Sequence, residues 1–273
     1  MGVLNLRKHG ILAVTVPLAL VIVIFSFTSS YFLKLDPYKL DVMQMLEGPN
    51  DNHIFGTDEL GRDVFARTIH AARISITVGF ISVFIGAVGG VIIGVISAFK
   101  GGFVDFLLMR FMEVVFCFPA ILLAIILMAN LGTNIINAML AIGIIFIPGF
   151  ARLTRATTYN VLKEQYIDSA ICLGIPKIKI IFREILPNII APIVVEAAVA
   201  FSYAILLESS LSFLGLGAQP PEPTWGNMIN TGRGFIENAP WITLVPGITL
   251  FVCVLIFNLI GDGLRDALDP NLD

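Results

Sequence analysis

Six long blocks of apolar residues constrain this chain more than any other feature. A bilayer's hydrocarbon core of about 30 Å requires roughly 20 apolar residues per crossing helix. The blocks also lack the short alternating pattern of a membrane β-barrel. We therefore predict an all-α membrane protein with six transmembrane helices. The predicted spans are Ile11–Leu33, Ile74–Phe99, Phe103–Leu131, Ile135–Ala151, Ile189–Phe213 and Trp241–Gly261.

The composition excludes most other classes of protein. The 273 residues are 57% apolar and 14% charged, whereas soluble domains carry roughly 25% charged residues. A net charge of −3 provides no basic surface for nucleic acid. The few histidines and cysteines are scattered, and the chain contains neither an HExxH nor a Walker A sequence. We predict no catalytic residue, no metal and no cofactor bound by this chain, and therefore no enzyme activity.

Lysine and arginine residues in short loops predict the orientation. With a cytoplasmic N-terminus, ten basic residues lie inside and six outside, and six spans also place the C-terminus inside (N-in/C-in). The inner ten are Arg7, Lys8, Lys100, Arg152, Arg155, Lys163, Lys177, Lys179, Arg183 and Arg265; the outer six are Lys34, Lys39, Arg62, Arg67, Arg73 and Arg233. The first block exceeds the about 7–15 residues of a signal-peptide core, so we predict an uncleaved signal anchor.

This orientation divides the chain into three parts. Residues 1–73 form the signal anchor and an outer loop, residues 74–261 form a five-helix core with a cytoplasmic loop at 152–188, and residues 262–273 form a cytoplasmic tail. In the outer loop, the segment from Gly56 to Asp63 predicts a turn followed by an amphipathic helix on the membrane surface. That loop would contact a partner protein or seal the outer mouth.

The cytoplasmic loop is the most informative segment. Thr157–Leu173 favours a helix, and Gly174-Ile175-Pro176 interrupts it, because glycine suits a left-handed C-terminal residue and proline opens the next helix. Ile175–Leu186 then predicts a short basic amphipathic helix, and Leu186-Pro187 redirects the chain into the fifth span. A loop of this kind rests on anionic lipid headgroups or docks into a groove of a cytoplasmic partner.

The order of small residues in this loop resembles a known family. Asp168-Ser169-Ala170, then Gly174, then Leu186-Pro187 is similar to the EAA loop of binding-protein-dependent ABC importer permeases. Asp168 and Ser169 stand where the family has Glu and Ala, and Glu184 stands where the general pattern has Ile.

Three further segments resemble the dipeptide/oligopeptide/nickel subfamily of these permeases. Residues 55–63 (FGTDELGRD) look like its sequence before the second span. Residues 212–217 (SFLGLG) with 224–226 (TWG) look like its fifth-to-sixth connection, and residues 258–266 (NLIGDGLRD) with 268–270 (LDP) look like its ending. Within the subfamily the chain resembles the C-type permease of a heterodimeric pair.

The resemblance implies a type I ABC importer permease fold and a machine with several subunits. The implied partners are a second permease, two ATPase subunits that hold ATP and Mg, an extracellular solute-binding protein and membrane lipid. The implied location is a bacterial or archaeal plasma membrane, crossed several times. The predicted cargo is dipeptides or oligopeptides, and the alternative is nickel or a metal chelate. A partner-independent secondary transporter is the alternative from another class, but such proteins normally show repeated halves.

The resemblance also implies that the loop transmits the ATPase movement to the spans. The coupling element would run from Asp168 to about Ile180, with an apolar docking face on Ile175, Ile178 and Ile181. The residues assigned to the coupling loop are Asp168, Ser169, Ala170, Gly174, Ile175, Ile178, Leu186 and Pro187.

Several residues within the spans are candidates for packing or transport. Gly86, Gly90 and Gly94 recur every four residues and predict close helix packing. Charged residues inside a membrane default to functional or bundle-facing positions, and the candidates for the translocation path or a gate are Glu113, Phe118, Glu196 and Glu208. Arg110 and Glu113 have the spacing of a helical ion pair, and the role of Asp105 stays open. Phe118-Pro119 and Pro148 predict helix kinks.

Overall fold

The structure, a computed structural model, describes residues 2–32 and 36–268. Within these residues the fold is helical, with one isolated β-bridge between Thr57 and Asp63. The α-helices are α1 (Gly2–Phe32), α2 (Val64–Lys100), α3 (Gly102–Phe116), α4 (Ala120–Leu131), α5 (Ile135–Val161), α6 (Gln165–Cys172), α7 (Lys177–Ile180), α8 (Leu186–Phe213), α9 (Trp225–Gly232) and α10 (Trp241–Leu268). Short 3₁₀ turns span Val42–Gln44 and Arg233–Phe235, and a π-helical turn spans Ile181–Ile185.

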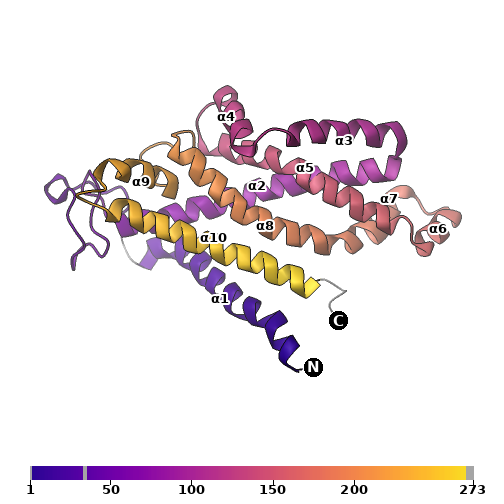
Figure 1. The fold of residues 1–273 in the computed structure, drawn as a ribbon, viewed down its shortest axis with the longest axis horizontal. Coiled ribbons are helices and arrows are strands. Elements are labelled where there is room, and N and C mark those ends of the chain that lie inside the picture. Colours follow the sequence, from indigo (N-terminus) through magenta and orange to yellow (C-terminus); the bar gives the residue numbers. More distant parts are fainter. Residues whose placement is uncertain (1, 33–35, 269–273) are drawn as a thin grey trace.

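The long helices run along the long axis of the molecule (Figure 1). The loop before α2 and the short helix α9 lie at one end, and α6 and α7 lie at the other. The start of α1 and the end of α10 lie on the same side of the bundle, because the two helices pack side by side. This arrangement separates two polar ends by a helical middle.

The number of membrane spans differs in detail from the six predicted. Four helices in the described residues are long and apolar enough to cross a bilayer: α2, α5, the continuous helix Lys177–Phe213, and α10. Within α1, the apolar stretch Leu12–Thr28 is shorter, so its role as a span stays a prediction. The predicted third span is broken into α3 and α4, which meet at an angle of 93°.

The break between α3 and α4 coincides with the predicted kink at Phe118-Pro119. Pro119 stands at the N-cap of α4, and proline cannot continue a helix because it lacks the backbone N–H and its ring clashes with the preceding turn. Pro148, by contrast, lies inside α5 without ending it. The third span is therefore two separate helices rather than one kinked helix.

Three predicted boundaries are wrong. Residues after Asp63 do not form a separate surface helix, because α2 begins at Val64 and continues unbroken to Lys100. The inner loop is shorter than predicted, since α5 extends to Val161. Leu186-Pro187 does not redirect the chain, because Lys177–Phe213 forms one helix. The π-helical turn just before Pro187 changes the hydrogen-bonding register, which accommodates its missing N–H.

The centre of the bundle is the contact between α2 and α5. A β-carbon on Gly86 would lie 2.6 Å from Phe146 Cβ, one on Gly90 2.3 Å from Phe150 Cβ, and one on Gly94 2.6 Å from Thr154 Cβ. These separations are below any van der Waals contact, so the two backbones approach as closely as glycine allows. The main apolar core forms around this contact, with Ile142 and Leu211 among its fully buried side chains.

Candidate functional site

The loop between α5 and α8 is bent by a glycine. Gly174 has φ = +73°, the left-handed region that glycine adopts without a steric penalty. Its N–H donates to the Ile171 carbonyl at 2.9 Å, and the Ile175 N–H donates to the Ala170 carbonyl at 3.1 Å. This is the paired hydrogen-bond pattern of a Schellman motif, and it fixes the angle at which α6 gives way to α7.

The inner side of this loop is anchored in an apolar cluster. Ile167, Ala170 and Ile180 are buried with Ile185 and Ile189 of the following helix, and Leu186 packs against them. Asp168, Ser169, Gly174 and Pro187 are exposed. A β-carbon on Gly174 would find no atom within 4 Å. The residues predicted for the coupling loop are thus brought together in a rigid bend from Gln165 to Ile185, which we call the elbow. Its outer surface is free within the described chain.

The exposed apolar face of the elbow is not the predicted one. Of the predicted face, Ile178 is 63% exposed, but Ile175 and Ile181 pack against the buried cluster. The large exposed apolar side chains here are Ile171, Leu173, Ile178 and Phe182. The prediction missed Leu173 because it took the docking face only from the segment after Gly174. It missed Phe182 because it assumed a regular helix there, whereas a π-helical turn spans Ile181–Ile185.

A partly buried ion pair joins the three helices α2, α3 and α5. Arg155 of α5 donates from Nε and Nη2 to the two carboxylate oxygens of Asp105 on α3, each at 2.5 Å. Ser97 of α2 also donates to Asp105. A bidentate guanidinium–carboxylate pair fixes geometry as well as charge. Asp105, whose role the sequence left open, therefore holds α2, α3 and α5 in register.

Replacing Asp105 with asparagine should lower the free energy of unfolding by about 2 kcal/mol, the usual scale for hydrogen bonds to charged groups. Arg155 would lose its charged acceptor while keeping its position. The matched control is Glu113→Gln, which removes an exposed carboxylate whose 2.9 Å pair with Arg110 has side chains 54% and 62% exposed. Exposed pairs contribute about 0–1 kcal/mol. Thermal unfolding in detergent measures both, and equal losses would contradict the assigned role.

The candidates for the translocation path are not brought together into one site. Glu113 is exposed on α3 and paired with Arg110. Glu208 is 1% exposed and accepts hydrogen bonds from Ser75 and Ser212, each at 2.7 Å. This enclosure between α2 and α8 favours a structural role for Glu208. Phe118 and Glu196 share one pocket, which lies beside the α3–α4 break.

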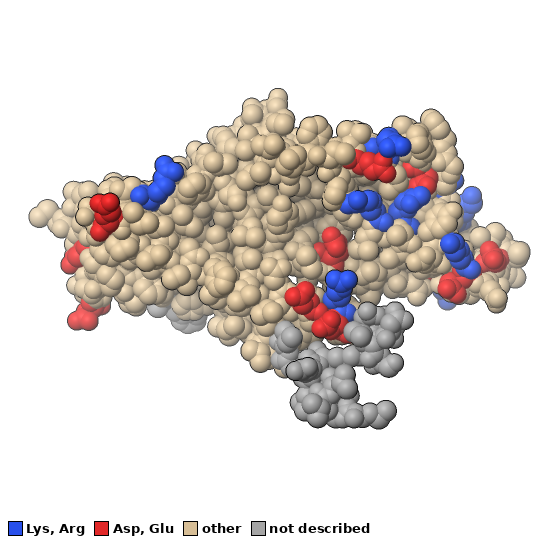
Figure 2. Space-filling view, in the orientation of Figure 1, with Lys and Arg blue, Asp and Glu red and all other residues tan. Residues whose placement is uncertain are grey.

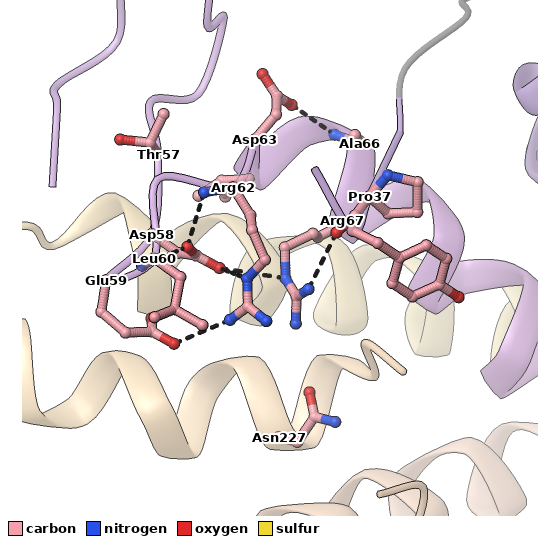
Figure 3. A network of polar contacts seen from close by, with 12 residues as sticks. Pro37, Thr57, Asp58, Glu59, Leu60, Arg62, Asp63, Ala66, Arg67 and Asn227 are labelled. Carbon is pink, nitrogen blue, oxygen red and sulfur yellow. Dashed lines mark hydrogen bonds and ion pairs between the residues drawn. The ribbon is translucent and has the colours of Figure 1, made fainter. Parts of the chain in front are cut away.

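A network of charges holds the loop that precedes α2 (Figure 3). Asp58 accepts from Arg62 Nε at 2.7 Å and lies 3.4 Å from Arg67 Nε, and Arg62 also pairs with Glu59 at 2.9 Å. Asp63 caps α2 by accepting from the Ala66 N–H at 2.7 Å. Burial, with the neighbouring Asp58 charge second, raises the pKa of Glu59. Residues 55–63, a family-like pattern in the sequence, thus form a folded cap.

The cap is fastened to the rest of the same end of the molecule. A β-carbon on Gly61 (φ = +71°) would lie 1.8 Å from the Asp41 carbonyl oxygen, so only glycine fits this approach. Trp241 of α10 donates from Nε1 to the Thr57 carbonyl at 3.0 Å. Tyr38 donates to Glu222 at 2.9 Å. Burial, with Glu222 second, raises the pKa of Tyr38 to about 12, so its phenol remains a donor.

Charged side chains form two groups in Figure 2, one at the end that carries α9 and one spread over much of the opposite half. A wide band without charges separates them on the face shown. The same helices that form this band carry the long apolar stretches. An uncharged band between two charged ends is the surface that a lipid bilayer requires of a protein crossing it.

Comparisons with known proteins agree with this geometry. Residues 90–273 match the family model described as "binding-protein-dependent transport system inner membrane component". The chain is 42% identical over 271 residues to a dipeptide transport system permease protein, DppC, of Alkalihalophilus pseudofirmus, which covers 99% of this chain and 85% of the relative. It is 41% identical over 268 residues to a glutathione transport system permease protein, GsiD, of Pectobacterium atrosepticum, covering 98% and 89%.

A solved structure shares the fold. An inward-facing structure of the methionine ABC transporter MetNI matches with a TM-score of 0.62 at 16% identity, covering 75% of this chain and 97% of the matched chain. The family model and the two relatives define the class as a multi-pass permease of an ABC importer. The chain belongs to the family of binding-protein-dependent transport system inner membrane components.

Proposed function

We propose that this chain is one of two permeases in an ATP-driven importer of dipeptides or short oligopeptides. The assignment of peptides as cargo rests on one observation. The chain is 42% identical, over nearly its whole length, to a permease named for dipeptide transport. The relative named for glutathione transport also concerns a small peptide. Nickel or a metal chelate is the competing cargo.

The exposed face of the elbow indicates where an ATPase subunit would bind. The elbow exposes Ile171, Leu173, Ile178 and Phe182, an apolar face suited to a groove on a cytoplasmic protein. We assign that groove to an ATPase subunit, which binds ATP and Mg and performs the hydrolysis. The permease contributes movement, since a rigid elbow transmits displacement to the helices on either side.

The remaining partners belong to the outer side. A second permease would complete the path, and an extracellular solute-binding protein would deliver cargo near the cap formed by residues 55–63. We propose the N-in/C-in orientation for the bundle and a bacterial or archaeal plasma membrane as the location of the complex. The bound ATP and Mg belong to the ATPase subunits, and this chain holds neither.

Reconstitution of the complete complex tests the proposal. We would prepare proteoliposomes that contain both permeases and the ATPases and supply them with the binding protein. They should accumulate a radiolabelled dipeptide when ATP is present on the side of the membrane that the ATPases face. Omitting the ATPases should reduce uptake to background. Accumulation of Ni²⁺ in place of the dipeptide would contradict the proposal that the cargo is a peptide. Transport by this chain alone, driven by an ion gradient, would reject the assignment to an ATP-driven machine.

A further inference from the structure

A pocket of about 410 Å³ lies beside the break between α3 and α4. The broken pair contributes Phe116 and Phe118, α5 contributes Phe146 and Phe150, and α8 contributes Glu196 and Tyr203. Because α3 and α4 bend by 93°, the rings at the break project beside α8 rather than along a continuous helix. The pocket is aromatic and contains the carboxylate of a membrane-spanning helix.

The Glu196 carboxylate is available for a ligand. None of the described residues donates a hydrogen bond to it or forms an ion pair with it, although the side chain is half-buried. Gly149 lies beside it in the pocket lining, since a β-carbon built there would lie 3.8 Å from Glu196 Oε1. Glycine at this position keeps that side of the pocket unobstructed.

Glu208 on the same helix is an example of a carboxylate that is buried and hydrogen-bonded within the chain. It is 1% exposed and receives hydrogen bonds from Ser75 and Ser212. Glu196 lies twelve residues earlier, about 18 Å along the helix axis, and has no such donors in the described chain. A carboxylate in a membrane-spanning helix is costly unless it is paired or serves a function. Its partner is therefore expected from outside this chain.

The chemistry of the lining specifies a positively charged organic group. A carboxylate forms its strongest hydrogen bonds with charged donors, and the faces of Phe118 and Tyr203 attract an ammonium group. Arg152 lies over the ring of Phe116, with its guanidinium carbon 3.9 Å from the ring centre. Arg152 itself lines a neighbouring pocket, together with Asp105 and Arg155, and not this one. The free α-amino group of a peptide is a positively charged organic group of the kind that this lining favours.

We propose that Glu196 is an ammonium subsite on the translocation path, where it binds the free α-amino group of a peptide in transit. This inference rests on the proposed function, because it needs a peptide as cargo. The subsite selects peptides with an unblocked N-terminus. A metal ion is not its ligand, because a single carboxylate among aromatic rings lacks the several oxygen or nitrogen donors that metals require.

Direct binding to the permease–ATPase complex tests the subsite without the selectivity of the binding protein. Equilibrium dialysis would measure a radiolabelled dipeptide and its N-acetyl derivative. The wild-type complex should bind the free dipeptide about tenfold more tightly than the acetylated one, and Glu196→Gln should lose this difference. Glu196→Asp, which keeps the charge but shortens its reach, should retain part of it and also serves if Glu196→Gln does not assemble.

Two controls separate a site from a general defect. Glu237→Gln removes an exposed carboxylate from the turn between α9 and α10 and should bind both ligands as the wild type does. ATPase activity stimulated by the loaded binding protein reports that each variant assembles. Equal binding of the two ligands by the wild type, absence of saturable binding, or an unchanged preference in Glu196→Gln would each overturn the subsite.

Failure of the inference is distinguishable from failure of the proposed function. If the wild-type complex accumulates the dipeptide in proteoliposomes and Glu196→Gln binds the free and acetylated peptides alike in dialysis, both statements hold. If the wild type accumulates the dipeptide and the variant keeps its binding preference in dialysis, peptide import stands and the subsite is wrong. If the wild type accumulates no peptide, the cargo itself is wrong, and the subsite falls with it.

Discussion

Replacing Gly174 with valine should reduce peptide uptake by the complete complex about tenfold or more while the chain still inserts into the membrane. Valine at φ = +73° costs about 1–2 kcal/mol, which distorts the turn between α6 and α7. Its side chain would also project into space that is open within this chain and that we assign to the ATPase. A coupling free energy of about 1–3 kcal/mol corresponds to changes of roughly 5–150-fold. ATP hydrolysis and uptake measured on the same proteoliposomes report the loss of coupling.

Gly215 provides a matched control for this experiment. It has φ = +78°, and a β-carbon there would also meet no atom within 4 Å. The N–H groups of Gly215 and Leu216 donate to Ser212 and Leu211, which is the same motif at the end of α8. Gly215→Val therefore carries the same backbone strain away from the elbow. Normal uptake by Gly174→Val, or equal losses in the two variants, would contradict the role of the elbow in coupling.

Replacing Gly90 with leucine should prevent the chain from folding. A β-carbon at this position would lie 2.3 Å from Phe150 Cβ and 2.8 Å from the Ala151 backbone nitrogen, so the α2 and α5 backbones would have to separate. Overpacking by a small group costs about 1–3 kcal/mol, and leucine adds three more carbons to the same interface. Alanine should destabilise the chain less. Fluorescence-detected size exclusion and thermal unfolding in detergent would measure the loss of monodisperse protein.

Gly247 on α10 is the control for a glycine within a long apolar helix. A β-carbon there would meet nothing within 4 Å, so Gly247→Leu should be tolerated. The same amount of folded protein from the Gly90 and Gly247 variants would show that α2 and α5 do not depend on their close approach. The comparison isolates packing, because both substitutions introduce the same side chain into an apolar helix.

The loop between α5 and α8 shows how far the sequence could predict a site. The break at Gly174 was predictable, because glycine before an Ile-Pro pair provides both a left-handed helix end and the start of a new helix. The exposed face of the elbow was not predictable from periodicity. Whether Ile181 or Phe182 points outward depends on the π-helical turn at Ile181–Ile185, which the local pattern does not specify.

The charged residues show the same limit. Spacing along one helix identified the pair of Arg110 and Glu113, because residues three apart share a helical face. The pair of Asp105 and Arg155 joins residues fifty positions apart, and the partners of Glu208 come from α2 and α8. Such contacts depend on how helices pack against one another, so one sequence cannot reveal them.

By itself, the sequence determined that this protein lies in a membrane as a helical bundle, because twenty-residue apolar blocks have no other stable conformation in lipid. It also determined the family, through short motifs whose order is visible without a fold. Tertiary structure alone decided which carboxylate is enclosed and which is free. Glu196 and Glu208 lie on the same helix, yet only the packing of α2 and the break before α4 place one against two serines and the other in an aromatic pocket.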